Sequence, residues 1–127
     1  MKEIVSTQDA PKPVGPYSQA VRLNGMVFLS GQIPLDPRTG ELVTGSIQAQ
    51  TERVLENLRG VLKGAGLTFE DVVKTTVFLK NIDDFSQMNE AYGRYFTINP
   101  PARSTVEVAR LPRDVKVEIE AIAIERR

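Results

Sequence analysis

The chain has 127 residues and is 41% hydrophobic, which suits one ordinary core, so we expect a single domain over residues 1–127. Its sixteen basic residues balance its sixteen acidic ones, which argues against a nucleic acid or an anionic membrane as its partner. It contains no histidine and no cysteine, so it lacks the commonest general base, the thiol nucleophile and nearly every transition-metal ligand. Its chemistry must use Arg, Glu, Asp, Tyr, Asn, backbone groups and water.

The N-terminal sequence bears on where the protein works. Residues 1–6 lack the apolar run of a signal peptide, and no stretch of about 18 apolar residues occurs in the chain. We therefore expect a cytosolic protein with no membrane partner.

The first third of the chain reads as a short strand, a proline-rich loop and a hairpin. Residues 4–5 favour the short strand, and the prolines of residues 7–16 cannot pair inside a sheet. Residues 18–23 and 26–30 are typical of strands, and the Asn24-Gly25 pair between them is a strong hairpin signal. Residues 31–40 follow as loop and turn, because glycine and proline interrupt them densely.

The middle of the chain alternates between helix and strand. Apolar residues recur at spacings of three and four over residues 46–65, which predicts a long helix that Gly64 and Gly66 end. Residues 72–79 form a β-branched and aromatic run typical of a strand. Residues 84–96 predict a second helix, with Asp84 and Gln87 spaced as a capping box. Its expected inward face consists of Phe85, Met88, Tyr92 and Phe96.

Two last strands are expected over residues 102–108 and 115–125. About six strands and two helices indicate a two-layer α+β sandwich, in which the helices cover one face of a mixed sheet. The final strand carries Val and Ala on one side, whereas Glu118, Glu120, Ile122 and Ile124 lie on the other. A face that mixes isoleucine with carboxylates favours burial against another subunit, so we expect a homo-oligomer.

Arg103 interrupts an otherwise alternating strand. It shares one side of that strand with Thr105 and Glu107, and we expect this to be the polar side, like that of Glu118 and Glu120. The core side is then expected to hold Ala102, Ser104, Val106 and Val108. A guanidinium beside a sheet core needs an anion, which it holds bidentately. Arg103 and the glutamates can converge in one subunit or across an interface, either as a structural ion pair or as a site.

Other polar residues are weaker candidates for a site. Tyr17 stands at a rigid turn, where its phenol can bind a ligand or simply pack. Gly31 either lets the main chain approach a ligand closely or only forms a turn. Asn89 is an amide within the apolar stripe of the second helix, and it needs partners from the protein or from a substrate. Glu118 and Glu120 suit a general acid/base pair or an exposed strand face. No phosphate-binding loop, catalytic triad or metal-ligand cluster occurs.

Four motifs occur together in this chain: Gly15-Pro16-Tyr17-Ser18-Gln19-Ala20, Leu29-Ser30-Gly31-Gln32-Ile33-Pro34, Pro101-Ala102-Arg103-Ser104 and Val106-Glu107-Val108-Ala109-Arg110-Leu111-Pro112. With them, the chain closely resembles the reactive intermediate deaminase (RidA, YjgF-type) family from about residue 6 to residue 127. The resemblance implies a chorismate-mutase-like fold, a homotrimer and ligand clefts between neighbouring subunits. It also implies hydrolysis, without a cofactor, of 2-imino acids such as 2-iminobutanoate and 2-iminopropanoate to 2-keto acids and ammonia, which protects pyridoxal-phosphate enzymes.

The resemblance also implies roles for particular residues. Arg103 matches the arginine that clamps the substrate carboxylate, and Glu118 matches the glutamate that holds the attacking water. The matching cleft is lined by Tyr17, Gly31, Asn89 and Thr105, where Thr105 replaces a cysteine of many relatives. Two other activities stay open: a non-catalytic module that binds small carboxylates, and an endoribonuclease or translation inhibitor, which would have to act without histidine or net positive charge.

Overall fold

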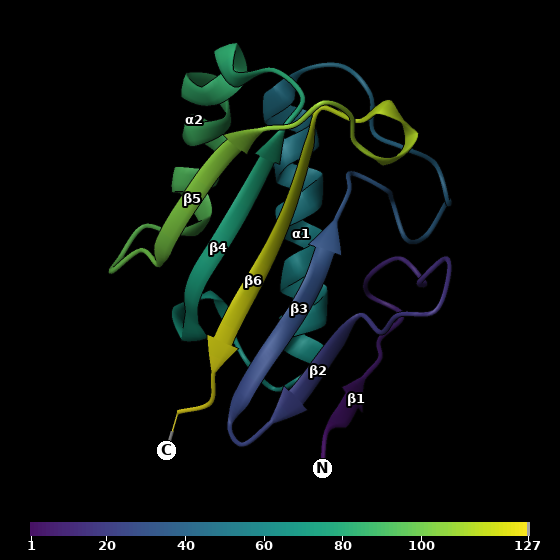
Figure 1. Ribbon diagram of the computed structural model, residues 1–127, viewed down its shortest axis with the longest axis vertical. Helices are drawn as coiled ribbons and strands as arrows, with labels where there is room; N and C mark the ends of the chain where they lie inside the picture. Colours follow the sequence, from purple (N-terminus) through teal and green to yellow (C-terminus); the bar gives the residue numbers. More distant parts are fainter. Residues whose placement is uncertain (127) are drawn as a thin grey trace.

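A computed structural model describes residues 1–126 of the chain (Figure 1). The strands are β1 (Glu3–Val5), β2 (Ala20–Leu23), β3 (Met26–Gln32), β4 (Val72–Leu79), β5 (Ala102–Glu107) and β6 (Val117–Ile124), and the helices are α1 (Ile47–Gly64) and α2 (Phe85–Tyr95). This confirms the predicted order of strands and helices. Most elements are shorter at their ends, whereas β3 continues through Gly31 and Gln32, which were expected in a loop. The sequence prediction for β2, for example, starts two residues too early.

The strands form one mixed sheet in the order β1-β2-β3-β6-β4-β5. Only the edge pair β4 and β5 is parallel, and every other neighbouring pair is antiparallel. Both helices lie behind the same face of this sheet, so the molecule has two layers, as predicted (Figure 1). The hydrophobic core lies between the helices and the central strands β3, β6 and β4.

Helix α1 forms where the sequence places its apolar stripe. The Ser46 side chain caps its start by accepting a hydrogen bond from the backbone N–H of Ala49 at 3.1 Å. Val54, Leu58 and Val61 are fully buried against the sheet. The helix ends at Gly64, and Gly66 follows with φ +78°, a left-handed conformation that suits glycine.

The start of α2 differs from the prediction. The Asp84 side chain makes no capping hydrogen bond, so the predicted capping box is wrong. A single 3-10 turn, Ile82–Asp84, precedes the helix, and the Asn81 side chain accepts from the backbone N–H of Asp83 at 2.9 Å. The capping group therefore lies one turn earlier than the sequence spacing suggests. Phe85, expected inside, is 37% exposed.

The proline-rich N-terminal loop is tied to the sheet by Gln19, which is only 3% exposed. The Gln19 amide donates to the carbonyl oxygens of Thr7, Ala10 and Pro11, and its oxygen accepts from the backbone N–H of Thr7 at 2.7 Å. Gly60 of α1 allows this loop to pass, because a side chain there would overlap the carbonyl group of Asp9. The loop that leads to Tyr17 is thus held in a defined place.

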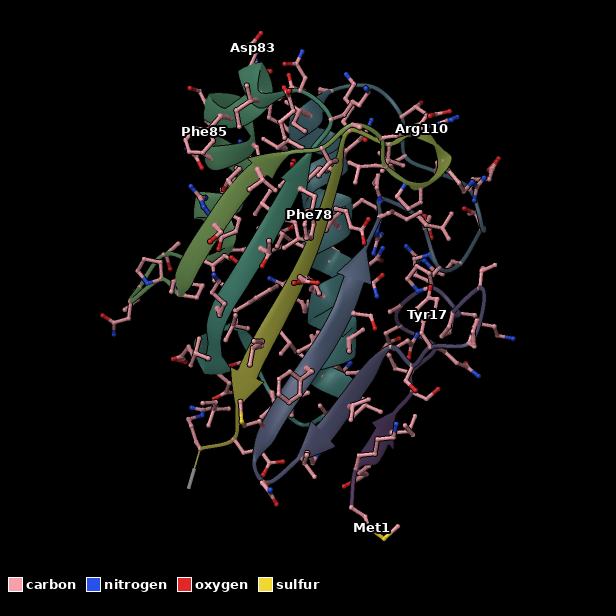
Figure 2. All side chains as sticks on the ribbon, in the orientation of Figure 1. Met1, Tyr17, Phe78, Asp83, Phe85 and Arg110 are labelled. Atoms are coloured by element: carbon pink, nitrogen blue, oxygen red, sulfur yellow. The ribbon has the colours of Figure 1, made fainter. Side chains whose placement is uncertain are left out.

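The second face of the sheet is open and largely apolar. Phe28 on β3 is 41% exposed and pairs with Ile122 of β6, and Met26 pairs with Ile124 beside it. Phe78 lies on this face as well, because it pairs with Glu118 (Figure 2). We call this surface the open apolar face; it consists of Ile4, Val21, Leu23, Met26, Phe28, Phe78, Ile122 and Ile124. It matches the face predicted from the final strand.

Candidate functional site

An open cleft of about 630 Å³ lies at one end of the sheet. It is bounded by the N-terminal loop, the end of β3, the beginning of β6 and the turn Pro112–Asp114. Tyr17 and Arg110 mark the two loops on either side of this end of β3 (Figure 2). Tyr17, Gly31 and Glu118 all line the cleft, so the structure brings three of the predicted site residues together.

A β-bulge places Gly31 against Glu118. Leu29 pairs with Ala121 and Gln32 pairs with Ile119, so two residues of β3 stand opposite the single Glu120 of β6. A Cβ atom added at Gly31 would overlap the carboxylate of Glu118. Glycine is therefore needed here because of a close approach, and the group that approaches is a carboxylate of the chain itself, whereas the sequence suggested a ligand or only a turn.

The carboxyl group of Glu118 is half-buried on the cleft wall. Burial raises the pKa of Glu118 above its ordinary value, and the neighbouring Glu120 carboxylate raises it further. Glu118 makes no hydrogen bond or ion pair within the part of the chain that the structure describes. A carboxyl group with a raised pKa in a cleft is suited to accept and return a proton.

Tyr17 is 52% exposed on the loop above Glu118. Its hydroxyl oxygen accepts a weak hydrogen bond from the backbone N–H of Val14 at 3.4 Å, and its position leaves the ring open to a ligand. Tyr17 is therefore not a residue of the hydrophobic core, and it lies on the wall of the cleft.

Arg103 lies elsewhere, at the edge strand β5. Its guanidinium carbon stands 4.7 Å from the centre of the Tyr92 ring and 5.4 Å from that of Phe85, both on α2. The Tyr92 hydroxyl is hydrogen-bonded to the Thr75 hydroxyl at 2.7 Å, and burial raises the pKa of Tyr92. The guanidinium of Arg103 is therefore held over the rings of Tyr92 and Phe85, and no group among residues 1–126 engages its N–H groups in a hydrogen bond or ion pair.

Asn89 and Thr105 lie on the same side of the sheet as Arg103. Asn89 lies four residues after Phe85 and three before Tyr92, so it is on the helix face over which Arg103 stacks. The side-chain oxygen of Asn89 and the hydroxyl of Thr105 are buried without a hydrogen-bond partner among the described residues. Buried oxygens of this kind need a donor, which a ligand or a neighbouring chain can supply.

The predicted faces of β5 are wrong. Arg103 pairs with Thr75 and Thr105 pairs with Val77, and both partners are buried on the helix side of the sheet. Arg103 therefore faces the helices, while Glu118 pairs with Phe78 on the open face. The residues expected in the core, Ala102, Ser104 and Val106, are exposed. Alternation alone does not identify the core side of β5. The open face of this sheet is itself apolar, so Ala and Val occur on both sides.

The six predicted site residues thus form two groups on opposite faces of one chain. Tyr17, Gly31 and Glu118 form the cleft group. Asn89, Arg103 and Thr105 form the edge group. Strand β4 separates β5 from β6, so the groups do not meet within one subunit. Phe85, at the edge group, lies far across the sheet from Tyr17 (Figure 2).

Sequence reasoning missed three residues around these groups. Phe85 and Tyr92 were expected only as core residues, yet the guanidinium of Arg103 packs over their rings. Their spacing with Asn89 was the available signal. Arg113 lines the cleft beside Glu118, and its sequence context gave no indication of this.

Within residues 1–126, no three carboxylates gather as potential metal ligands. None of the helices in this described part is long and apolar enough to span a membrane.

Comparison with known proteins places this arrangement in a family. The family described as Endoribonuclease L-PSP matches residues 7–125. A 2-iminobutanoate/2-iminopropanoate deaminase of Salmonella typhimurium is 50% identical over 129 residues, which cover 99% of this chain and 100% of the relative. A RutC family protein of Pyrococcus horikoshii is 55% identical over 123 residues, which cover 97% of this chain and 98% of the relative.

Solved structures agree with the fold throughout the chain. A crystal structure from Thermotoga maritima superimposes with a TM-score of 0.97 at 57% identity and covers 100% of both chains. The E. coli protein TdcF with bound serine superimposes with a TM-score of 0.93 at 47% identity and covers 98% of this chain and 99% of its own. The chain therefore belongs to the endoribonuclease L-PSP family, which is the YjgF/RidA family.

Proposed function

We propose that this protein is a cytosolic, cofactor-free deaminase that hydrolyses reactive 2-imino acids, such as 2-iminobutanoate and 2-iminopropanoate, to 2-keto acids and ammonia. The observation that carries the proposal is the Glu118 carboxyl group, seated against Gly31 in an open cleft with a raised pKa. The deaminase of Salmonella typhimurium, at 50% identity over the whole chain, supports the choice of substrate. The activity would protect pyridoxal-phosphate enzymes from these imines.

The complete site would form between subunits of a homotrimer. Within one chain, Glu118 faces the open side of the sheet and Arg103 the helix side, so a substrate cannot contact both. A neighbouring subunit packed on the open apolar face could bring its Arg103 to this cleft. The exposed Phe28 and Ile124 support such packing, because a face of this kind is commonly buried in an oligomer.

In this site Arg103 would fix the substrate carboxylate with two N–H groups. Its stacking on Tyr92 and Phe85 orients the guanidinium plane before the substrate arrives. Asn89 and Thr105, whose buried oxygens have no partner among the described residues, could accept hydrogen bonds from the imine nitrogen or from ordered water. The backbone near Gly31 would hold the rest of the substrate.

Glu118 would act as the general base. The substrate enters as the protonated imine. Glu118 accepts a proton from water while the water oxygen bonds to the imine carbon, and the π electrons of the C=N bond move to nitrogen, which becomes a neutral amino group. Glu118 then returns its proton to that nitrogen; the C–N bond breaks, the C=O bond forms, and the hydroxyl proton passes through Glu118 to the departing ammonia, which leaves as ammonium. The step consumes one water and needs neither a covalent nucleophile nor a metal.

Two alternatives have some support. A module that only binds small carboxylates would also use Arg103, and the related TdcF was crystallised with serine bound. An endoribonuclease agrees with the family description, but the chain has no histidine and a net charge of zero. It would predict strongly salt-sensitive RNA binding.

The test is to couple a serine/threonine dehydratase to this protein and measure the rate of 2-keto acid formation. The parent should accelerate that rate, and Arg103→Ala and Glu118→Gln should each lose the acceleration. Arg38→Ala, which removes an exposed arginine outside the cleft, is the control and should behave as the parent. No acceleration by the parent, with small carboxylates still bound, would favour the binding module.

A further inference from the structure

The turn that precedes β6 has an unusual backbone. Arg113 has φ 55° and ψ 24°, and Asp114 has φ 58°, so two consecutive residues with side chains are left-handed. Glycine, asparagine or aspartate normally occupies such positions, so Arg113 is the unusual residue, and strain of this kind persists only where the surroundings enforce it. Such outliers cluster at binding sites, so the position of this turn in the fold matters.

Three contacts enforce the turn. The Arg110 guanidinium forms a two-pronged ion pair with the Asp114 carboxylate, at 2.9 and 3.5 Å. The backbone N–H of Asp114 donates to the carbonyl of Leu111 at 3.0 Å. Leu111 and Val115, on either side of the turn, are buried. The carboxylate of Asp114 is thus engaged outside the cleft, while Arg113 lines the cleft.

Arg113 is the charged group of this turn that lines the cleft, together with Glu118 and Glu120. Both glutamates line the same cleft, yet neither lies within 4.0 Å of the Arg113 guanidinium in an ion pair among the described residues. Lys12, from the N-terminal loop, lines the cleft as well. The cleft therefore holds two cations that are not neutralised at contact distance, in addition to the Arg103 that a neighbouring subunit is proposed to bring.

We propose that Arg113 binds a second carboxylate on the substrate, so that the protein hydrolyses dicarboxylic 2-imino acids, such as the imine of glutamate, as well as the small neutral ones. This rests on the proposed function. The completed cleft would hold two glutamates and three cations, namely Arg113, Lys12 and the neighbour's Arg103. Its net charge would therefore be plus one. A protonated imine with two carboxylates carries one negative charge and balances the cleft, whereas one with a single carboxylate carries none.

The cleft of a single chain measures about 630 Å³, within the range of ordinary small-molecule sites, and a neighbouring subunit would close part of it. An arginine suits the outer carboxylate because its planar donors hold both oxygens at once. Removing the arginine should therefore lower kcat/KM for the dicarboxylic substrate far more than for the neutral one.

The experiment measures selectivity. 2-Iminoglutarate is generated from glutamate by an amino-acid oxidase and 2-iminobutanoate from 2-aminobutanoate, and kcat/KM is measured for both with the parent, Arg113→Asn and Arg113→Lys. Asparagine is chosen because it tolerates the left-handed backbone, so the turn should be retained. Arg38→Asn is the matched control, because it removes the same charge from outside the cleft.

The ratio of kcat/KM for 2-iminoglutarate to that for 2-iminobutanoate should fall about 10-fold or more in Arg113→Asn and less in Arg113→Lys, and stay at the parental value in Arg38→Asn. If the parent hydrolyses 2-iminobutanoate but not 2-iminoglutarate, or if the ratio is the same in Arg113→Asn, the inference is wrong and the proposed function stands. If the parent hydrolyses neither imine, the proposed function itself fails. Calorimetric binding of 2-oxoglutarate, tighter than that of 2-oxobutanoate only while Arg113 is present, is a second readout that needs no turnover.

Discussion

The carboxylate of Glu118 occupies the space that a side chain on Gly31 would fill. Gly31→Ala should therefore displace the carboxylate and leave most of the fold in place, because the overlap involves the end of a flexible side chain. A displacement of about 1 Å at a catalytic group can cost ~100-fold in rate, so we expect kcat/KM to fall by about that factor. Imine hydrolysis and thermal unfolding would be measured together.

Gly93→Ala is the matched control for that substitution. Gly93 lies within α2, its added Cβ would meet nothing within 4 Å, and its φ is not positive. Alanine there should keep the activity and stabilise the protein by about 0.4–1 kcal/mol. Equal activity losses in both variants would contradict the steric account of Gly31.

The raised pKa of Glu118 predicts the pH dependence of the rate. A general base acts only when deprotonated, so kcat/KM should fall as the pH is lowered through the pKa of Glu118, at a pH above the ordinary value of 4.5. Glu120 contributes to the shift, so Glu120→Gln should move the acidic limb to lower pH. A pH–rate profile of the two proteins checks both statements. A limb that does not move in Glu120→Gln would contradict the assigned cause.

The same shift predicts a change in stability. The folded protein holds the Glu118 proton more tightly than the unfolded chain, so the unfolded chain loses its proton first as the pH rises. Stability then falls as the pH rises from the unfolded pKa to the folded pKa, and the loss is complete above the folded value. Glu118→Gln removes this loss, so its Tm should exceed that of the parent at pH 7, and the difference should vanish at about pH 4 and below. Thermal unfolding followed by circular dichroism tests this.

The sequence predicts the helices and the strand order because their signals are local and periodic. Helix α1 has an apolar residue every three or four positions and glycines at its end, and the structure keeps both. The faces of β5 were not predictable in the same way. Apolar residues occur on both faces of this sheet. Val106, for example, is 42% exposed, although it lies on the side expected in the core. Alternation defines two faces but does not say which one the helices cover.

The sequence indicates which residues are candidates for the site, but it does not show how they are arranged in space. The resemblance to the family indicated Arg103 and Glu118 as candidates, but their positions on opposite faces follow from the register of β4 with β5 and β6. Arg113 was missed for another reason. Left-handed residues are usually glycine, asparagine or aspartate, so Asp114 fits this turn, whereas nothing in the sequence marks the arginine before it as left-handed.

Arg103→Lys tests the stacking of the guanidinium. Lysine keeps the charge, but its ammonium group cannot lie flat on Tyr92 and Phe85 or hold a carboxylate with two parallel hydrogen bonds. We expect KM for 2-iminobutanoate to rise about 10- to 100-fold with a smaller change in kcat. Steady-state kinetics of Arg38→Lys, which should match the parent, controls for the substitution itself. Unchanged KM in Arg103→Lys would show that charge alone is sufficient.

The open apolar face should determine the oligomeric state. Phe28 is 41% exposed beside Ile122, and a charge placed there would have to be buried in any subunit interface that covers this face. Phe28→Glu should therefore give folded monomers, visible as a smaller mass by sedimentation and an unchanged far-ultraviolet circular dichroism spectrum. Because Arg103 and Glu118 face opposite sides of one chain, these monomers should also lose imine hydrolysis. Lys63→Glu, on the exposed side of α1, should stay oligomeric and active. An active monomer would mean that one chain completes the site alone, which the geometry of β5 and β6 argues against.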